Sequence, residues 1–573
     1  MTETLSLITE RVDDIPLLLA QMQHIDLAEI IDSHLLPHGN RQGLSYGVLA
    51  CVWLAHILSQ ADHRMNHVRG WVQKCQYTLQ RLLPQAFVET DFTDDRLADL
   101  LRALSIDANW EALETDLNRK SIAVYHLPTK VVRLDATTVS FDTDPEGLFR
   151  YGHSKDHRPD LAQVKMMLAT LDPLAMPLLS HIVAGNSADD PLYLPAVEQV
   201  RKSLDQRGLL YVGDCKMAAK ETRAGIASGQ DFYLCPLALI QMSNEQILAH
   251  LQPVLEERQP LHPVERLQSN GQVEIIARGY EWIEVQEVAG FSWQERRLLV
   301  RSEAFAEASE RGLDTRLASA QQQIALLTLR GKGRRPPTDV TEARQAVETI
   351  LTRYQVTGLL AIDITEQTQE RRVRGYRGGP ERVQSEIRIA ITCTVDSKAV
   401  AITKATLGWR VYATNATAEK LSLSEAVLLY RDEYRIEHNF ARLKGHPLSV
   451  SPLYVSRKDH AKGLIRLLTL GLRVLSLLEF AVRQRLSEQS ETLLGLYAGN
   501  PKRATIRPTA ERLLEAFKNI TLTLIQHSGQ SLRHLTPLTP LQQRILELLE
   551  LWPEVYTRLL TDSDLPPQKM SEP

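Results

Sequence analysis

The spacing of hydrophobic residues separates the chain into helical and strand-rich stretches. Between residues 15 and 58, apolar positions recur every three to four residues, which is the period of a helix with one buried face. A further stretch of this kind begins at Asp94 and Asp95, acids suited to a helix N-terminus, and continues to Leu104. This pattern predicts a helical N-terminal domain over residues 1–125.

The pattern changes at Val131. Segment 131–141 is rich in β-branched residues, and two more apolar segments follow it, separated by the turn signal Asp172-Pro173. A helical stretch, a short strand, a second helix and a further strand come next. Three strands, helix, strand, helix, strand is the order of an α/β core with helices covering its sheet, and we assign the first part of this core to residues 126–240.

Strand-like segments predominate from residue 241 to 420, with helical stretches at 303–329 and 341–354. This region is predicted to be a β-rich insertion. The chain then becomes helical again, first over 421–485 and then in a C-terminal region, 486–573. The predicted fold class is therefore α/β, with a core interrupted by a β-rich insertion and with helical regions at both ends.

Charge and cysteine content narrow the classes of function. The 573 residues contain 66 Lys and Arg against 70 Asp and Glu, a formal charge of −4. A nucleic-acid partner would therefore have to meet local positive patches, because the chain is not basic throughout. The five cysteines are scattered and form no C-x-x-C pair. This argues against a disulfide framework or a structural zinc site and suits a reducing cytoplasm.

No membrane segment is expected. The N-terminus carries acids where a signal peptide would carry lysine or arginine. The strongest apolar run, 464–482, contains Arg466, Arg473 and Glu479, and a membrane span would have to bury these charges. We predict a buried helix of a soluble, cytoplasmic protein.

Two aspartates end predicted strands. Asp135 closes the segment VVRLD, and Asp214 closes LLYVGD. Carboxylates at the C-terminal edge of an α/β sheet are well placed to face a ligand. Strand-end aspartates also commonly cap the next turn, and this alternative stays open.

A third candidate group lies on a predicted helix, SEAVLLYRDEYRIEHNFARLKG. Its residues Tyr430, Glu437 and Lys444 are seven apart, so they fall along one stripe of a continuous helix. A solvated face is the alternative interpretation. Two strand aspartates and a helix glutamate can, however, supply oxygen ligands for two magnesium ions, as in phosphoryl-transfer sites. The sequence contains no P-loop and no D-x-D-x-T phosphatase motif.

The order of strand-Asp135, strand-Asp214, β-rich insertion and helix-Glu437 resembles the DDE transposases of bacterial insertion sequences, in particular the insertion-sequence-four group. That group has an RNase H-like core and a Y-x2-R-x3-E-x6-K signature followed by E-x-x-F-x-x-L-K. Residues 437–444 match the second pattern throughout. The signature arginine is replaced by Glu433, so we expect Arg431 or Arg435 to take over its phosphate contact.

The resemblance implies a reaction and a site. Asp135, Asp214 and Glu437 would hold two Mg²⁺ ions, for which Mn²⁺ can substitute. Water would cut the strand at the element end, and the freed 3′-hydroxyl would then join target DNA. Tyr430 and Lys444 would contact phosphates near the scissile bond. A homodimer paired on double-stranded DNA, comprising the element's terminal inverted repeats and the target, is the expected active form, with the N-terminal domain a candidate for binding element ends.

Further DNA contacts are predicted outside the carboxylate site. A basic stretch in the insertion contains Arg371, Arg372, Arg374 and Arg377, and such patches make salt-dependent phosphate contacts. Trp409 is the candidate for stacking a flipped base, with Trp282 and Trp293 as reserves. The alternatives are an ordinary solvated loop for the arginines and a core position for the tryptophan.

Two other functions remain open from the sequence. One is a catalytically inactive transposase descendant that only binds DNA as a regulator. The other is an RNase H-like nuclease that cuts DNA but does not transfer strands. The three carboxylates disfavour the first, and the large segment between Asp214 and Glu437 disfavours the second.

Overall fold

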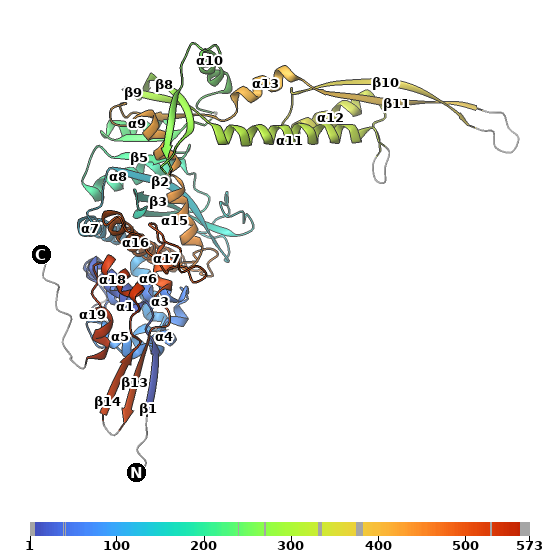
Figure 1. Cartoon of the computed structure of the whole chain (residues 1–573). Helices are drawn as coiled ribbons and strands as arrows, with labels where there is room; N and C mark the ends of the chain where they lie inside the picture. The colour runs from blue at the N-terminus through green and yellow to red at the C-terminus, as the bar shows by residue number, and fades with distance from the viewer. Residues whose placement is uncertain are drawn as a thin grey trace, which may run out of the picture. The chain divides into compact units, whose positions relative to one another are not determined.

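The computed structural model describes residues 6–37, 39, 42–238, 240–268, 271–329, 335–373, 382–527 and 530–561. The chain divides into two compact units (Figure 1). The first unit contains Met1–Cys235, Gln286–Trp293 and Leu429–Pro573, and the second contains Pro236–Val285 and Gln294–Leu428.

The N-terminal part of the first unit is helical, as the apolar spacing predicts. Its helices are α1 (Ile15–His24), α2 (Leu27–His34), α3 (Tyr46–Gln60), α4 (Met65–Lys74), α5 (Gln76–Leu82), α6 (Asp94–Ser105) and α7 (Asp107–Tyr125). A strand that the spacing did not predict, β1 (Ser6–Arg11), precedes them. It pairs with β13 (Thr521–His527), which pairs in turn with β14 (Gln530–Leu535). The partner of β1 lies at the other end of the chain, so local sequence carries little sign of the pairing.

Five neighbouring strands of a larger mixed sheet form the centre of the first unit. They are β2 (Val131–Phe141), β3 (Ala162–Leu171), β4 (Met176–Ala184), β5 (Leu210–Gly213) and β6 (Phe232–Pro236), in the order β4-β3-β2-β5-β6. The first three strands are antiparallel, whereas β5 is parallel to β2 and β6 is parallel to β5. Helices α8 (Asp190–Leu204) and α9 (Lys220–Ser228) connect the later strands. The prediction of an α/β arrangement is confirmed.

The longest helix of the first unit, α16 (Lys458–Glu488), carries the apolar run that contains three charged residues. All three are buried and make ion pairs or hydrogen bonds with other side chains. Arg466 pairs with Asp107, Arg473 donates to the Asn118 side chain over 2.6 Å, and Glu479 pairs with Arg442. Buried charges are tolerated when they are paired in this way. Within the described ranges, no helix is long and apolar enough to cross a membrane.

The remaining C-terminal elements are short. They are α17 (Ala510–Glu515), α18 (Pro540–Leu548) and α19 (Glu554–Thr557), which lie around β13 and β14 in sequence. The five cysteines all lie within the described residues and form no disulfide.

The signature helix is not continuous, and that prediction is wrong. The segment forms α14 (Leu423–Arg431) and α15 (Tyr434–Lys444). At the junction the amides of Asp432 and Glu433 bond to carbonyls three residues earlier, which is 3₁₀ geometry. The guanidinium of the buried Arg133 donates to the carbonyl of Leu429 over 2.9 Å. It thereby occupies an acceptor that a continuous helix would use for the Glu433 amide.

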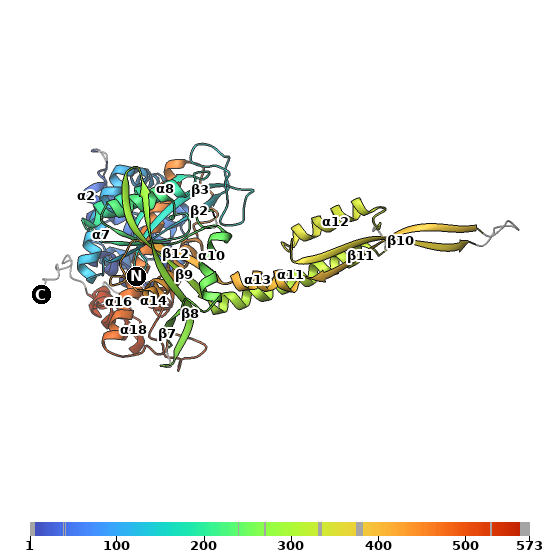
Figure 2. The ribbon, with the colours of Figure 1, turned by 90° about the horizontal axis from the view of Figure 1, so that it is seen from above.

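The second unit contains four neighbouring strands and a helix-supported hairpin. The strands are β12 (Trp409–Thr414), β9 (Phe291–Ser302), β8 (Val273–Val288) and β7 (His262–Leu267), in that order. The hairpin β10 (Leu360–Val373) and β11 (Arg382–Val395) lies beside α11 (Glu303–Leu327) and α12 (Val340–Arg353), as Figure 2 shows. An apolar cluster that includes Leu313, Val347 and Leu360 joins them. The sequence pattern predicted these elements except β7, and it did not predict α10 (Asn244–Leu255) or α13 (Ser397–Thr406).

Candidate active site

The two strand aspartates occupy neighbouring positions on adjacent parallel strands. Leu134 of β2 pairs with Gly213 of β5, and each is followed directly by an aspartate, Asp135 and Asp214. Adjacent strands lie about 4.8 Å apart. The sheet register therefore brings the two carboxylates together, although they are far apart in sequence. The charge of Asp214 acts directly on Asp135.

Asp214 is oriented by two donors. The Tyr193 hydroxyl, from α8, donates to Asp214 Oδ1 over 2.6 Å, and the Lys216 amide donates to the same oxygen over 2.9 Å. Burial and the charges of Asp214 and Asp135 raise the pKa of Tyr193 well above its usual value. The phenol therefore remains a donor. Sequence analysis missed Tyr193, because a tyrosine in the first turn of a helix carries no distinctive spacing.

Asp135 is largely buried, with its side chain 18% exposed. Burial raises its pKa to about 7; the ammonium of Lys155 opposes this shift and the charge of Asp214 adds to it. The Lys155 Nζ lies 3.4 Å from Asp135 Oδ1 and 4.0 Å from Asp189 Oδ2, and it also donates to the carbonyl of Ala136. A positive group thus already faces Asp135 in this structure.

Lys155 lies on the connection between β2 and β3, and the next residue fixes that connection. The Lys155 amide donates to Thr138 Oγ1 over 3.0 Å. The Asp156 carboxylate accepts hydrogen bonds from the hydroxyls of Ser140 and Ser451, over 3.3 and 3.1 Å, and pairs with Lys444. The signature lysine therefore holds the β2–β3 connection and is engaged with a protein carboxylate.

Helix α15 presents Glu437 in its first turn, with an exposed side chain. The helix packs against β2. Arg435 donates to the carbonyl of Pro173 over 2.9 Å, and Asn439 donates to the carbonyl of Ala175. Arg442 pairs with Glu479 and Glu511 at the other end of the helix. These contacts fix the helix that carries Glu437.

Glu433 belongs to the same acidic environment. Burial raises its pKa, a hydrogen bond with Tyr430 lowers it, and the charges of Asp214 and Glu437 raise it again. Glu433 therefore lies within electrostatic range of both a strand aspartate and the helix glutamate. The residue that departs from the signature is thus a further carboxylate near the site.

The donor set suits a hard divalent cation, since carboxylate oxygens are the ligands that Mg²⁺ prefers. Asp135 and Asp214 are adjacent and together carry more negative charge than Lys155 offsets. In the part of the chain that the structure describes, no three carboxylate, imidazole or thiol side chains converge closely enough to hold one metal ion. The structure therefore brings the aspartate pair together and places Glu437 on a helix that packs against the same sheet.

The other predicted site residues lie in different settings. Tyr430 is buried on α14, and Arg431 ends that helix half-buried. Arg435 also pairs with Asp432 over 2.6 Å, so its guanidinium is engaged with protein groups. These residues do not share one continuous helix face with Glu437.

The predicted DNA contacts of the insertion belong to the second unit. Arg371 and Arg372 lie near the end of β10, whereas Arg374 and Arg377 fall outside the described residues. Trp409 is partly buried against the cluster of Met242, Leu251, Tyr280, Leu299 and Val411, and its indole donates to the carbonyl of Ala405 over 3.0 Å.

The two reserve tryptophans are also engaged. The Trp282 ring stacks on His250 with centroids 3.9 Å apart, and its indole donates to Glu284 over 2.8 Å. Trp293 is buried and donates to the Tyr233 hydroxyl over 2.9 Å. A core role is plain for Trp293, and base stacking stays a prediction for Trp409.

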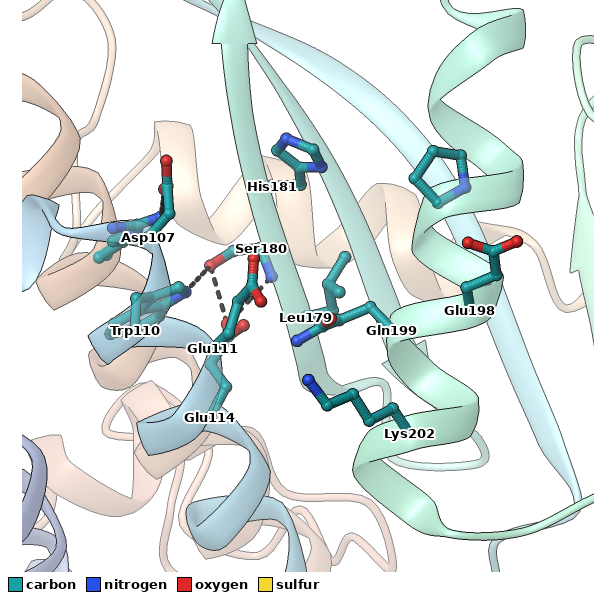
Figure 3. A pocket seen from close by; sticks show the side chains of 12 residues that line it. Asp107, Trp110, Glu111, Glu114, Leu179, Ser180, His181, Glu198, Gln199 and Lys202 are labelled. Atoms are coloured by element: carbon teal, nitrogen blue, oxygen red, sulfur yellow. Dashed lines mark hydrogen bonds and ion pairs between the residues drawn. The ribbon is translucent and has the colours of Figure 1, made fainter.

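A separate cavity of about 420 Å³ lies among α7, β4, α8 and α16, and none of the three predicted catalytic carboxylates lines it. Figure 3 shows Trp110 and Glu114 pointing toward Ser180. The Trp110 indole donates to Ser180 Oγ over 3.1 Å, and the Ser180 amide and hydroxyl donate to Glu114 Oε1 over 3.0 and 2.9 Å. Burial raises the pKa of Glu114 to about 8.

This carboxyl gives a prediction about stability. The folded-state pKa of Glu114 exceeds its unfolded value. The contribution of the protonated Glu114 carboxyl to the free energy of unfolding is therefore complete at pH 4 and is lost as the pH rises toward 8. Glu114→Gln keeps the Ser180 acceptor and removes the ionisation. We expect little change in Tm at pH 5 and an increase of about 3 °C at pH 8.5. Differential scanning calorimetry across this range measures the effect; parallel pH profiles for the two proteins would contradict it.

Comparisons with known proteins identify the chain's family. The family model described as "Transposase DDE domain" matches residues 126–472, more than half of the chain and a segment that includes Asp135, Asp214 and Glu437. Comparison with curated proteins gives no match. Among solved structures, the chain is similar to the piggyBac transposase in a cryo-EM synaptic complex with hairpin DNA, at 9% identity, over 88% of this chain and 79% of that chain, with a TM-score of 0.34. From the family match we conclude that this protein belongs to the DDE transposases.

Proposed function

We propose that this transposase cuts DNA at the ends of its own insertion sequence and joins the freed ends to target DNA, with Asp135, Asp214 and Glu437 as its catalytic carboxylates. The observation that carries the proposal is the register of β2 and β5, which sets the two aspartates side by side where the parallel pairing of these strands ends. Carboxylates in this arrangement suit divalent metal ions.

The strand order supports an RNase H-like core. Three antiparallel strands, β2 to β4, are followed by β5 and β6, which run parallel to β2, and β2 is central. This is the order of strands in RNase H-like proteins. Asp135 lies in β2, the first strand of this core, and Asp214 directly follows β5, the fourth.

Each residue has a proposed task. Asp135 and Asp214 would hold divalent metal, Mg²⁺ or Mn²⁺, and Glu437 would complete the ligand set from α15. Bound metal would activate the attacking water or 3′-hydroxyl and stabilise the leaving oxygen. Tyr193 and the Lys216 amide orient Asp214, a role that outer partners of metal ligands commonly have.

DNA would be bound by positive groups in each of the two units. Arg431 is a proposed phosphate contact, and the arginines at the end of β10 would add salt-dependent contacts from the second unit. Trp409 is the proposed stacking residue. Two ends must be cut and joined together, so we propose a homodimer on DNA as the active form.

An assay with purified protein, DNA carrying its element end, target DNA and Mg²⁺ tests the proposal. We expect both strand cleavage and joined products, with cleavage lost in Asp135→Ala, Asp214→Ala and Glu437→Ala. End binding without cleavage by the wild-type protein would favour a DNA-binding regulator. Cleavage without joined products would favour a nuclease. Either result would overturn the proposed transposition activity.

A further inference from the structure

A lysine outside the family signature faces the paired aspartates. Lys155 Nζ lies 3.4 Å from Asp135 Oδ1 and 4.0 Å from Asp189 Oδ2. The signature lysine, Lys444, is instead paired with Asp156, the residue next to Lys155. Lys155 therefore contacts Asp135 and Asp189, whereas Lys444 contacts Asp156 in the β2–β3 connection.

Hydrogen bonds and an ion pair of the neighbouring groups fix the backbone position of Lys155. Its amide is tied to Thr138 on β2, and the adjoining Asp156 carboxylate is held by two serines and Lys444. The base of the Lys155 side chain is thus anchored beside Asp135. Its side chain is 31% exposed, so the ammonium can leave Asp135 for a group arriving from solvent without a change in the backbone.

The neighbouring carboxylates explain why a cation is needed there. Asp189 is also paired with Lys165 of β3, so two lysines and three aspartates meet beside the Tyr193 hydroxyl, whose pKa the charges of Asp135, Asp189 and Asp214 all raise. Asp214 instead accepts hydrogen bonds from the Tyr193 hydroxyl and the Lys216 amide. Lys155 is therefore the ammonium shared by Asp135 and Asp189.

A divalent ion and an ammonium group cannot share the same carboxylate oxygen without repulsion. An ion bound at Asp135 would displace the Lys155 ammonium, whose anchored base keeps it close by. The anion that arrives with DNA is a phosphodiester. Lysine binds phosphate as a mobile point charge, so the displaced ammonium is well suited to contact the phosphate next to the metal site.

We propose that Lys155 is a catalytic residue that neutralises Asp135 before metal binds and then contacts a phosphate of the bound DNA. Lys444 is a positioning residue, which acts through Asp156 to hold the connection that carries Lys155. This inference rests on the proposed function. It assigns to Lys155 a phosphate contact that the signature alone assigns to Lys444.

The test compares Lys155→Met, Lys155→Arg, Lys444→Met and the double variant Lys155→Met/Lys444→Met. Lys404→Met is the matched control, because Lys404 is 32% exposed and paired with Asp314 over 2.8 Å in the second unit. Two quantities are measured: Mn²⁺ affinity of the DNA-free protein, by the electron paramagnetic resonance signal of free Mn²⁺, and the rate of end cleavage at saturating Mg²⁺ and DNA.

We expect Lys155→Met to bind Mn²⁺ about five- to tenfold more tightly, because the competing ammonium is gone. Its cleavage rate should fall by a factor on the order of 10², and Lys155→Arg should recover part of that loss. Lys444→Met should slow cleavage in the wild-type background but cause no further loss in Lys155→Met. Lys404→Met should match the wild type in both measurements.

Unchanged Mn²⁺ affinity and cleavage in Lys155→Met would overturn the inference. Losses that multiply in the double variant would also overturn it, since Lys444 would then contact DNA independently. Failure of the proposed function itself would appear differently: the wild-type protein would neither bind Mn²⁺ in a manner that depends on Asp135 nor cleave end DNA.

Discussion

Asp135→Asn and Asp214→Asn are each expected to lower the rate of end cleavage by a factor on the order of 10³ while leaving end binding nearly unchanged. Asparagine preserves the size of the side chain and, for Asp214, an acceptor for the Tyr193 hydroxyl. It removes the negative charge that a divalent ion requires. Metal ions contribute several kcal/mol of transition-state stabilisation, and each 1.36 kcal/mol is tenfold in rate. Cleavage of labelled end DNA and a mobility-shift titration measure the two quantities.

Glu433→Gln and Glu437→Gln form the matched pair for this experiment. The charges of Asp214 and Glu437 both act on Glu433, but only Glu437 belongs to the segment that fits the E-x-x-F-x-x-L-K pattern. We expect Glu437→Gln to be inactive like the aspartate variants and Glu433→Gln to stay within a few-fold of the wild type. The reverse outcome would identify Glu433, and not Glu437, as the catalytic carboxylate of this segment.

Arg133→Ala is expected to destabilise the first unit by about 3–5 kcal/mol, because it leaves the buried carboxylate of Asp172 without its partner. Arg133 is 1% exposed and holds Asp172 through two nitrogens at 2.7–2.9 Å, in addition to its bond to Leu429. The same change also removes the hydrogen bond from the Arg133 guanidinium to the Leu429 carbonyl at the junction of α14 and α15. We therefore expect cleavage to fall as well, measured at a temperature where the variant is folded.

Arg119→Ala provides the control, since its ion pair with Asp116 is exposed and such pairs contribute roughly 0–1 kcal/mol. The double variant Arg133→Met/Asp172→Leu separates the effect of Arg133 on the stability of the first unit from its effect on the position of α15. Replacing both charges with apolar groups should restore most of the stability but not the bond to Leu429, so cleavage should remain low. Full recovery of cleavage in the double variant would contradict a role for Arg133 in positioning α15.

The α/β core was predictable because local patterns report it directly. The segment rich in β-branched residues predicted β2, and the apolar segment that ends at Asp214 predicted β5. The placement of Asp214 directly after β5 therefore followed from sequence, whereas Asp135, predicted to end its strand, lies within β2, which continues to Phe141. Their pairing did not, because register between β2 and β5 depends on how strands far apart in sequence align in the sheet.

Features decided by distant contacts were missed. The break between α14 and α15 depends on Arg133, almost 300 residues earlier, which takes the Leu429 carbonyl. The strand β1 depends on β13 near the other end of the chain. Lys155 and Tyr193 reach the site only through the fold, and neither has a spacing relation to the aspartates. Periodicity carries no signal for such contacts.

Cysteine substitution at the strand aspartates tests the central claim, that these carboxylates hold the metal used in DNA cleavage. A thiolate is a soft ligand, poorly suited to Mg²⁺ and more acceptable to Mn²⁺. We expect Asp214→Cys to be inactive with Mg²⁺ and to regain end cleavage with Mn²⁺, whereas the wild-type protein should cleave with both ions. Equal cleavage by Asp214→Cys in the two metals, at the wild-type rate, would contradict the central claim.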